Sequence, residues 1–167
     1  IVLYLTLGLG MSSSASSLAL MGAAVFIAIA APISGKLADR YGTARVMRTA
    51  LILYGIGLLI PLFFTDRAIV ATITPVFAFG GGVVMTLPFA LMIPLMGDLE
   101  HGLSTGIYSV SRGIGASLGP ILAGVAIGAS HGLFPGTQGY QAMWAVCAVS
   151  VLLSVPLVNR LRHLERS

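Results

Sequence analysis

Long uncharged stretches alternate with short polar segments along the chain. No Asp, Glu, Lys or Arg occurs in residues 1–35, and further charge-free runs cover 49–65 and 68–97. About 20 apolar residues in an α-helix span the hydrocarbon core of a bilayer. We therefore predict membrane-spanning segments at about 1–11, 18–33, 49–65, 68–97, 103–129 and 140–158, and we expect the first to be truncated.

The segments between these runs are short. They read SSSASS at 12–17, TDR at 65–67, DLEHG at 98–102 and SHGLFPGTQG at 130–139. The fourth run holds Pro75, Pro88, Pro94 and three consecutive glycines, so we expect it to bend. The pattern predicts an all-α membrane protein, with a helical bundle over 1–159 and a basic tail over 160–167.

Composition supports a membrane protein. Hydrophobic residues make up 57% of the chain and charged residues only 8%, whereas a soluble domain carries about 25% charged residues. The single cysteine, Cys147, leaves no disulfide framework or multi-cysteine metal site within the chain. The few Asp, Glu and His residues are scattered, so we expect no catalytic site, metal or cofactor, and a protein that is not an enzyme.

Basic residues gather in two places. Seven of the nine lie in residues 34–48 and in the tail, and the other two are Arg67 and Arg112. Basic residues mark the cytoplasmic ends of membrane helices. We therefore expect a multi-pass plasma-membrane protein whose charged loop 34–48 and C-terminus are cytoplasmic. This distribution also argues against nucleic acid as a partner, despite the net charge of +4.

The charged segment contains GKLADRYGTAR at residues 35–45. It resembles the loop signature of the major facilitator superfamily, G-x-L-a-D-r-x-G-r-r, which joins the second and third helices of each six-helix half. The matching residues are Gly35, Leu37, Ala38, Asp39, Arg40 and Gly42; Thr43 and Ala44 replace two usually basic positions, and Arg45 follows one place late.

The glycines and the aspartate of this segment suit a turn between two helices. Glycines permit a tight turn, and a carboxylate shortly before a helix is stabilised by about 0.3–1 kcal/mol. The resemblance implies a gating loop that latches helices together on the cytoplasmic face when the transporter is open to the outside. The alternative is a basic loop that only fixes topology.

The fifth run contains GIYSVSRGIGASLGPILAG at residues 106–124. Its glycines suit close helix packing, and its proline suits a kink. The stretch resembles the family's antiporter pattern, G-x8-G-x3-G-P-x2-G-G. The matching residues are Gly106, Gly115, Gly119, Pro120 and Gly124, with Ala123 in place of one glycine. The resemblance implies antiport; the alternative is a purely packing role.

Arg112 lies about ten residues into this fifth run, roughly 15 Å along a helix. An arginine inside a membrane is costly and is treated as functional by default. Our hypothesis is that Arg112, with Tyr108 and Ser109, faces a central cavity and contacts an anionic or polyhydroxylated solute. The alternative is an arginine that snorkels to the interface or pairs with Asp98 or Glu100.

The family resemblance implies one six-helix half of a twelve-helix transporter, and we expect the C-terminal half, with the first half as the alternative. Such transporters move a small solute by alternating access of two bundles around a midplane site. The first, fourth and fifth segments would face the cavity, and the third and sixth the lipid bilayer. The expected partners are therefore the solute, lipid and the missing other half of the chain.

Several mechanisms remain open at this stage. One is a proton-coupled efflux antiporter, in which a membrane carboxylate would have to lie in the other half, because no acidic residue falls inside a predicted span. Others are a symporter or uniporter for sugars or organic anions, and a non-transporting receptor or scaffold.

Overall fold

The computed structural model describes residues 2–64, 66–96 and 101–164. These form five long helices: α1 (Ser13–Tyr41), α2 (Thr43–Phe63), α3 (Arg67–Met96), α4 (His101–Ser130) and α5 (Ala142–Leu164). A π-helical turn, η1 (Tyr4–Gly8), precedes them, and a 3₁₀ turn, η2 (Pro135–Thr137), lies between α4 and α5. All five long helices contain a stretch long and apolar enough to cross a membrane. The all-α membrane architecture predicted from the sequence is confirmed.

Helix α1 is longer at both ends than the hydrophobic run at 18–33. It begins inside the expected loop at 12–17, because the side chain of Ser12 accepts a hydrogen bond from the backbone N–H of Ala15 at 3.3 Å. Such an N-cap satisfies one of the unpaired donors of the first turn. At its other end α1 continues to Tyr41. Most of the charged segment is therefore helix, not loop.

A single residue separates α1 from α2. Gly42 has φ 87° and ψ 137°, a backbone conformation that residues with a β-carbon rarely adopt. The reversal between the two helices thus depends on this one glycine.

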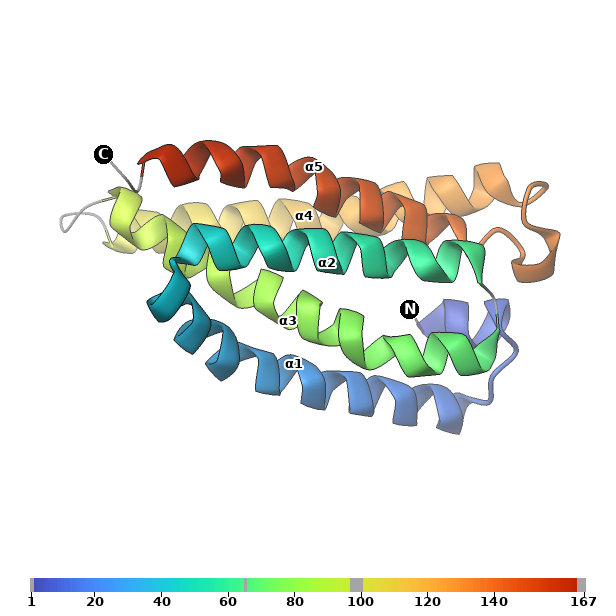
Figure 1. Cartoon of the computed structure of the whole chain (residues 1–167). Coiled ribbons are helices and arrows are strands. Elements are labelled where there is room, and N and C mark those ends of the chain that lie inside the picture. The colour runs from blue at the N-terminus through green and yellow to red at the C-terminus, as the bar shows by residue number, and fades with distance from the viewer. Residues whose placement is uncertain (1, 65, 97–100, 165–167) are drawn as a thin grey trace.

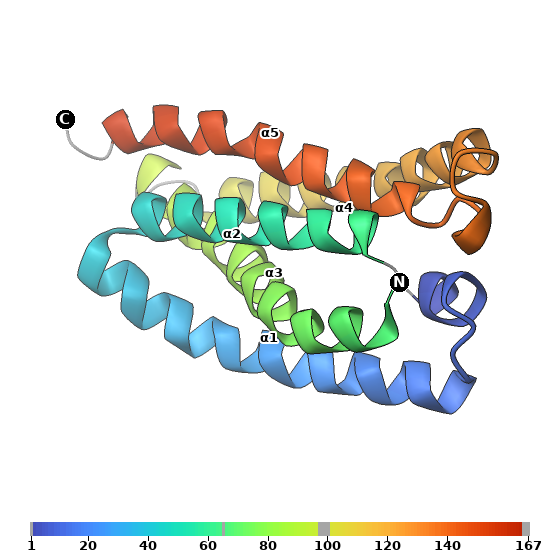
Figure 2. The same cartoon turned by 45° about the vertical axis from the view of Figure 1, so that its right-hand side comes forward.

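The long helices lie alongside one another as a bundle (Figures 1 and 2). Helix α3 packs against both α1 and α2, and α2 packs along α5, while α4 contacts α5 and, less extensively, α3. The α1–α2 turn and the C-terminal end of α5 lie at the same end of the bundle, and the loop between α4 and α5 lies at the opposite end. The charged segment 34–48 and the C-terminal end of α5 are therefore at the same end of the bundle.

The interior has two apolar clusters. The first joins α1, α2 and α3, with one buried residue from α5, and includes Met47, Leu51 and Leu87. The second lies around η1, where the ring of Trp144 meets Tyr4 edge-on at 5.2 Å and Phe77 at 5.7 Å between centroids. Edge-on aromatic pairs of this kind stabilise packing beyond their buried area. The short η1 segment is thereby fixed onto α2, α3 and α5.

The loop after α4 is tied to the end of α2 by one amide side chain. Gln141 donates from Nε2 to the carbonyl of Leu62 at 3.1 Å, and its Oε1 accepts from the hydroxyl of Thr137 at 3.0 Å. Both Gln141 and Thr137 are buried. A buried amide needs partners of this kind, so this contact fixes the loop on the bundle.

Candidate functional site: the open face of α4 and the basic end of α1

Helix α4 is the least covered helix of the bundle. Every residue from 105 to 130 is exposed or half-buried. A β-carbon added at any of its glycines would meet nothing within 4 Å, and this includes Gly106, Gly115, Gly119 and Gly124. Small residues in membrane helices allow close approach of a neighbour. In the described part of the chain, no neighbour makes that approach at the glycines of α4.

All three candidate cavity residues lie on this helix. Tyr108 is half-buried against α3: its hydroxyl donates to the carbonyl of Met85 at 3.3 Å, and its ring meets Phe89 edge-on at 5.4 Å. Ser109 and Arg112 are exposed. The structure thus separates an anchored tyrosine from a serine and an arginine that are open to a partner or solute.

Arg112 belongs to one stripe of α4. Tyr108, Arg112, Gly115 and Gly119 follow one another at intervals of four, three and four residues, which places them on one face of a helix. Arg112 is eleven residues from the start of α4, about 17 Å along its axis. The alternative partners Asp98 and Glu100 lie outside the described residues. On this stripe Arg112 is exposed and is followed by two glycines with open space beside them, whereas Tyr108 before it packs against α3.

The basic end of α1 differs from the expected loop. Asp39 and Arg40 are exposed in its last turn, and the Arg40 guanidinium lies 5.4 Å from the centre of the Tyr41 ring. The N-cap of α2 is Gly42, which makes no side-chain cap hydrogen bond. The dipole argument required Asp39 at the start of α2. In the structure α1 extends two residues beyond Asp39, so Asp39 lies in the last turn of α1 instead.

The other gating positions fall into two groups. A β-carbon at Gly35 would meet nothing within 4 Å. No helix of the described chain therefore makes a close contact at this glycine. Leu37 and Arg45 instead come together, from α1 and α2, at the wall of a groove. Asp39 and Arg40 do not line it.

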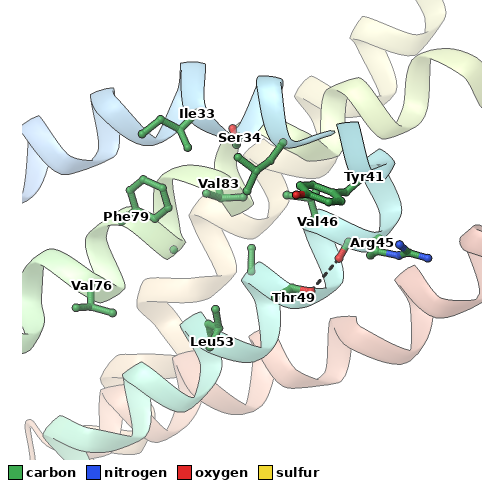
Figure 3. Close-up of a pocket in the computed structure, with 13 residues that line it drawn as sticks. Ile33, Ser34, Tyr41, Arg45, Val46, Thr49, Leu53, Val76, Phe79 and Val83 are labelled. Carbon is green, nitrogen blue, oxygen red and sulfur yellow. Dashed lines mark hydrogen bonds between the residues drawn. The ribbon is translucent and has the colours of Figure 1, made fainter. Parts of the chain in front are cut away.

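This groove has a volume of about 380 Å³ and lies between α1, α2 and α3 (Figure 3). Sequence reasoning missed it. The sequence does place Arg45, Thr49 and Leu53 at intervals of four residues on α2. The structure shows that all three are exposed. That periodicity defines one face of a helix, but only the packing of α1 and α3 shows that the face borders a groove.

Comparison with known proteins agrees with the fold. The profile of the Major Facilitator Superfamily matches residues 1–167. An uncharacterized MFS-type transporter, YfiU, of Bacillus subtilis (strain 168) is 28% identical over 118 residues, which cover 65% of this chain and 21% of that protein. A multidrug resistance protein B homolog of Mycobacterium tuberculosis (strain H37Rv) is 28% identical over 103 residues, which cover 62% of this chain and 19% of that protein.

The matched stretch is thus about a fifth of each relative. No solved structure matches the chain. The profile match extends over the whole sequence, and the five membrane-length helices fit it. The chain therefore belongs to the major facilitator superfamily.

Proposed function

We propose that this chain forms one six-helix bundle of a secondary transporter that moves a small solute by alternating access. The observation that carries the proposal is the open face of α4, where Arg112 is exposed and Gly115 and Gly119 have no neighbour within 4 Å. In transporters of this kind, two bundles move against each other around a site near the bilayer midplane. A bundle built for that motion must present a helix face whose partner lies outside the bundle.

Arg112 is the proposed solute contact. A guanidinium offers several N–H donors in a fixed planar arrangement, which suits carboxylates, phosphates and hydroxyl groups. Gly115 and Gly119 leave free space beside it on the same stripe. In the full transporter, an anionic or hydroxylated solute group can therefore approach Arg112 closely, with Ser109 as a second polar contact.

The end of α1 is the proposed cytoplasmic gate. Asp39 is exposed on the last turn, and the space beside Gly35 is open. A helix of the other half can approach at Gly35 and contact Asp39 in one conformation, and separate from both in another. We propose that this end and the C-terminus lie in the cytoplasm. We also propose that the bundle is the C-terminal half of the transporter and that it lies in the plasma membrane.

The proposed direction is export coupled to protons. Two features support it: the glycine-proline pattern in α4, and the similarity to a protein named as a multidrug resistance protein B homolog. The carboxylate that carries the proton would belong to the other half.

Flux through the full-length protein in proteoliposomes tests this function. A solute exporter coupled to protons responds to an imposed pH gradient; flux without that response indicates uniport or another coupling ion. A protein that moves no solute in either direction is a receptor or scaffold, and the proposal fails.

Substitution of Arg112 tests the solute contact. Arg112→Ala removes donors that α4 presents to the solute, so transport should fall at least about tenfold, the equivalent of about 1.4 kcal/mol. Arg112→Lys should retain part of the activity. Arg160→Ala, which removes the same charge from α5, is the matched control and should transport normally. Equal transport by Arg112→Ala and the unmodified protein would exclude Arg112 from the mechanism.

A further inference from the structure

The groove between α1, α2 and α3 lies apart from the proposed solute contact at Arg112. Helix α4 contributes no residue to it. Its walls are mostly apolar, with Ile33 and Leu37 from α1, Leu53 from α2, and Val76 and Phe79 from α3. A volume of about 380 Å³ falls within the range of about 300–1,000 Å³ found for small-molecule sites.

The groove is polar at one end only. Figure 3 shows Tyr41 and Arg45 together at one end, and Val76 and Leu53 towards the other. Two further hydroxyls line the groove, but each already donates to a backbone carbonyl: Thr49 to Arg45 at 3.1 Å and Ser34 to Ala31 at 2.8 Å. An occupant would therefore meet a cation at one end and hydrocarbon along the rest.

The length of the groove matches one leaflet of a bilayer. Arg45 and Leu53 are eight residues apart on α2, about 12 Å along the axis. The hydrocarbon core is about 30 Å thick, so a single leaflet accounts for about half of that. Arg45 is the third residue of α2, and therefore lies at the level of the lipid headgroups when Leu53 lies deep in the leaflet.

The open lining also suits lipid. Leu53 is 63% exposed and Val76 is 67% exposed, so both side chains are open to contact with an acyl chain. The segment 34–48 carries four basic residues and one acidic residue. Basic residues next to the cytoplasmic surface attract anionic lipids, and a guanidinium can bind a phosphate through two parallel hydrogen bonds.

We propose that this groove binds an anionic phospholipid of the cytoplasmic leaflet. One acyl chain lies over α3 between α1 and α2, and the phosphate is held at Arg45, with the Tyr41 hydroxyl as a second donor. Because the lipid contacts the helices on both sides of Gly42, it braces the turn between α1 and α2. This site is separate from the proposed solute contact at Arg112, so either proposal can fail without the other.

A photoreactive phosphatidylglycerol, with a diazirine on its acyl chain, tests the site in the full-length protein in detergent. Label should map to residues 33–53 and 76–83. Arg45→Ala should lower labelling about fivefold, and should abolish the preference over the matching phosphatidylcholine probe. Arg45→Lys should restore part of that preference, since it keeps the charge. Thr49→Trp, which fills the groove, should lower labelling by both probes.

Arg160→Ala is the matched control, because it removes a charge at the same end of the bundle but away from the groove. It should leave labelling unchanged. Only variants that elute as a single species in size-exclusion chromatography are compared. The proposal is overturned if label falls mainly on other helices, if Arg45→Ala labels normally, or if Arg160→Ala lowers labelling as much as Arg45→Ala.

Discussion

Glycines in α3 and α4 have opposite surroundings. A β-carbon at Gly82 of α3 would lie 2.7 Å from the β-carbon of Ala30 and 2.9 Å from the carbonyl oxygen of Ile27, both on α1. At Gly115 and Gly119 of α4 the same atom would meet nothing within 4 Å. One set of glycines brings two helices of the bundle together, and the other set faces no neighbour in the described chain.

This difference separates the stability of the bundle from its function. Membrane helices associate through close packing, because lipid already solvates their apolar side chains. The glycines of α3 supply that packing inside the bundle. Those of α4 are available for contacts with the rest of the transporter, or for space around a solute. Substitutions in the two helices should therefore have different effects.

The largest expected effect is on folding. Gly82→Val places side-chain atoms against the backbone of α1, which cannot move aside cheaply; overpacking of this kind costs about 1–3 kcal/mol. We expect much less full-length protein to elute as a single species in detergent, and a lower midpoint of thermal unfolding.

Gly119→Val is the matched variant, with the same side chain in open space. It should be purified normally but transport less solute, because the added atoms occupy the face that the partner or solute approaches. Normal stability of Gly82→Val, or a folding defect in Gly119→Val, would remove the contrast between the two helices.

An effect of about the same size is expected at the end of α1. Gly42→Ala forces a β-carbon into a backbone conformation with φ 87°, at a cost of about 1–3 kcal/mol. We expect a lower unfolding midpoint. Gly35→Ala lies within a helix and in open space, so alanine should stabilise α1 by about 0.5–1 kcal/mol.

Transport by the Gly35→Ala variant sharpens this comparison. If a helix of the other half approaches at Gly35, the variant should be stable but transport more slowly. Transport at the normal rate would show that no close contact forms there in the working cycle, and would count against the gate proposed for this end of α1.

The smallest expected effect concerns a hydrogen bond between helices. The hydroxyls of Ser34 and Thr86 lie 3.3 Å apart, and either can be the donor. Each can donate instead to a backbone carbonyl of its own helix, Ser34 to Ala31 at 2.8 Å and Thr86 to Gly82 at 2.7 Å. Hydrogen bonds between membrane helices contribute about 0.6 kcal/mol on average. Ser34→Ala should lower stability by about that amount. A double-mutant cycle with Thr86→Val measures the pair, and additive effects would show no coupling across α1 and α3.

Much of this fold could be read from the sequence. The charge-free runs identified the helices, because every backbone polar group in a bilayer must be satisfied within the helix, and length and hydropathy are local properties. The resemblance around Gly35 and Asp39 led to the family that the profile match shows. The glycines and Arg112 of the fifth run were also recognised as features of one helix.

The tertiary structure decided what those residues contact. Similar glycine-rich stretches became a tight interface in α3 and an open face in α4, and the expected charged loop became the end of a helix with Asp39 exposed. The groove requires three consecutive helices to pack together, because its lining residues run from Ile33 on α1 to Val83 on α3. Helix formation depends on neighbouring residues, whereas the face that each helix buries depends on long-range packing that no local pattern specifies.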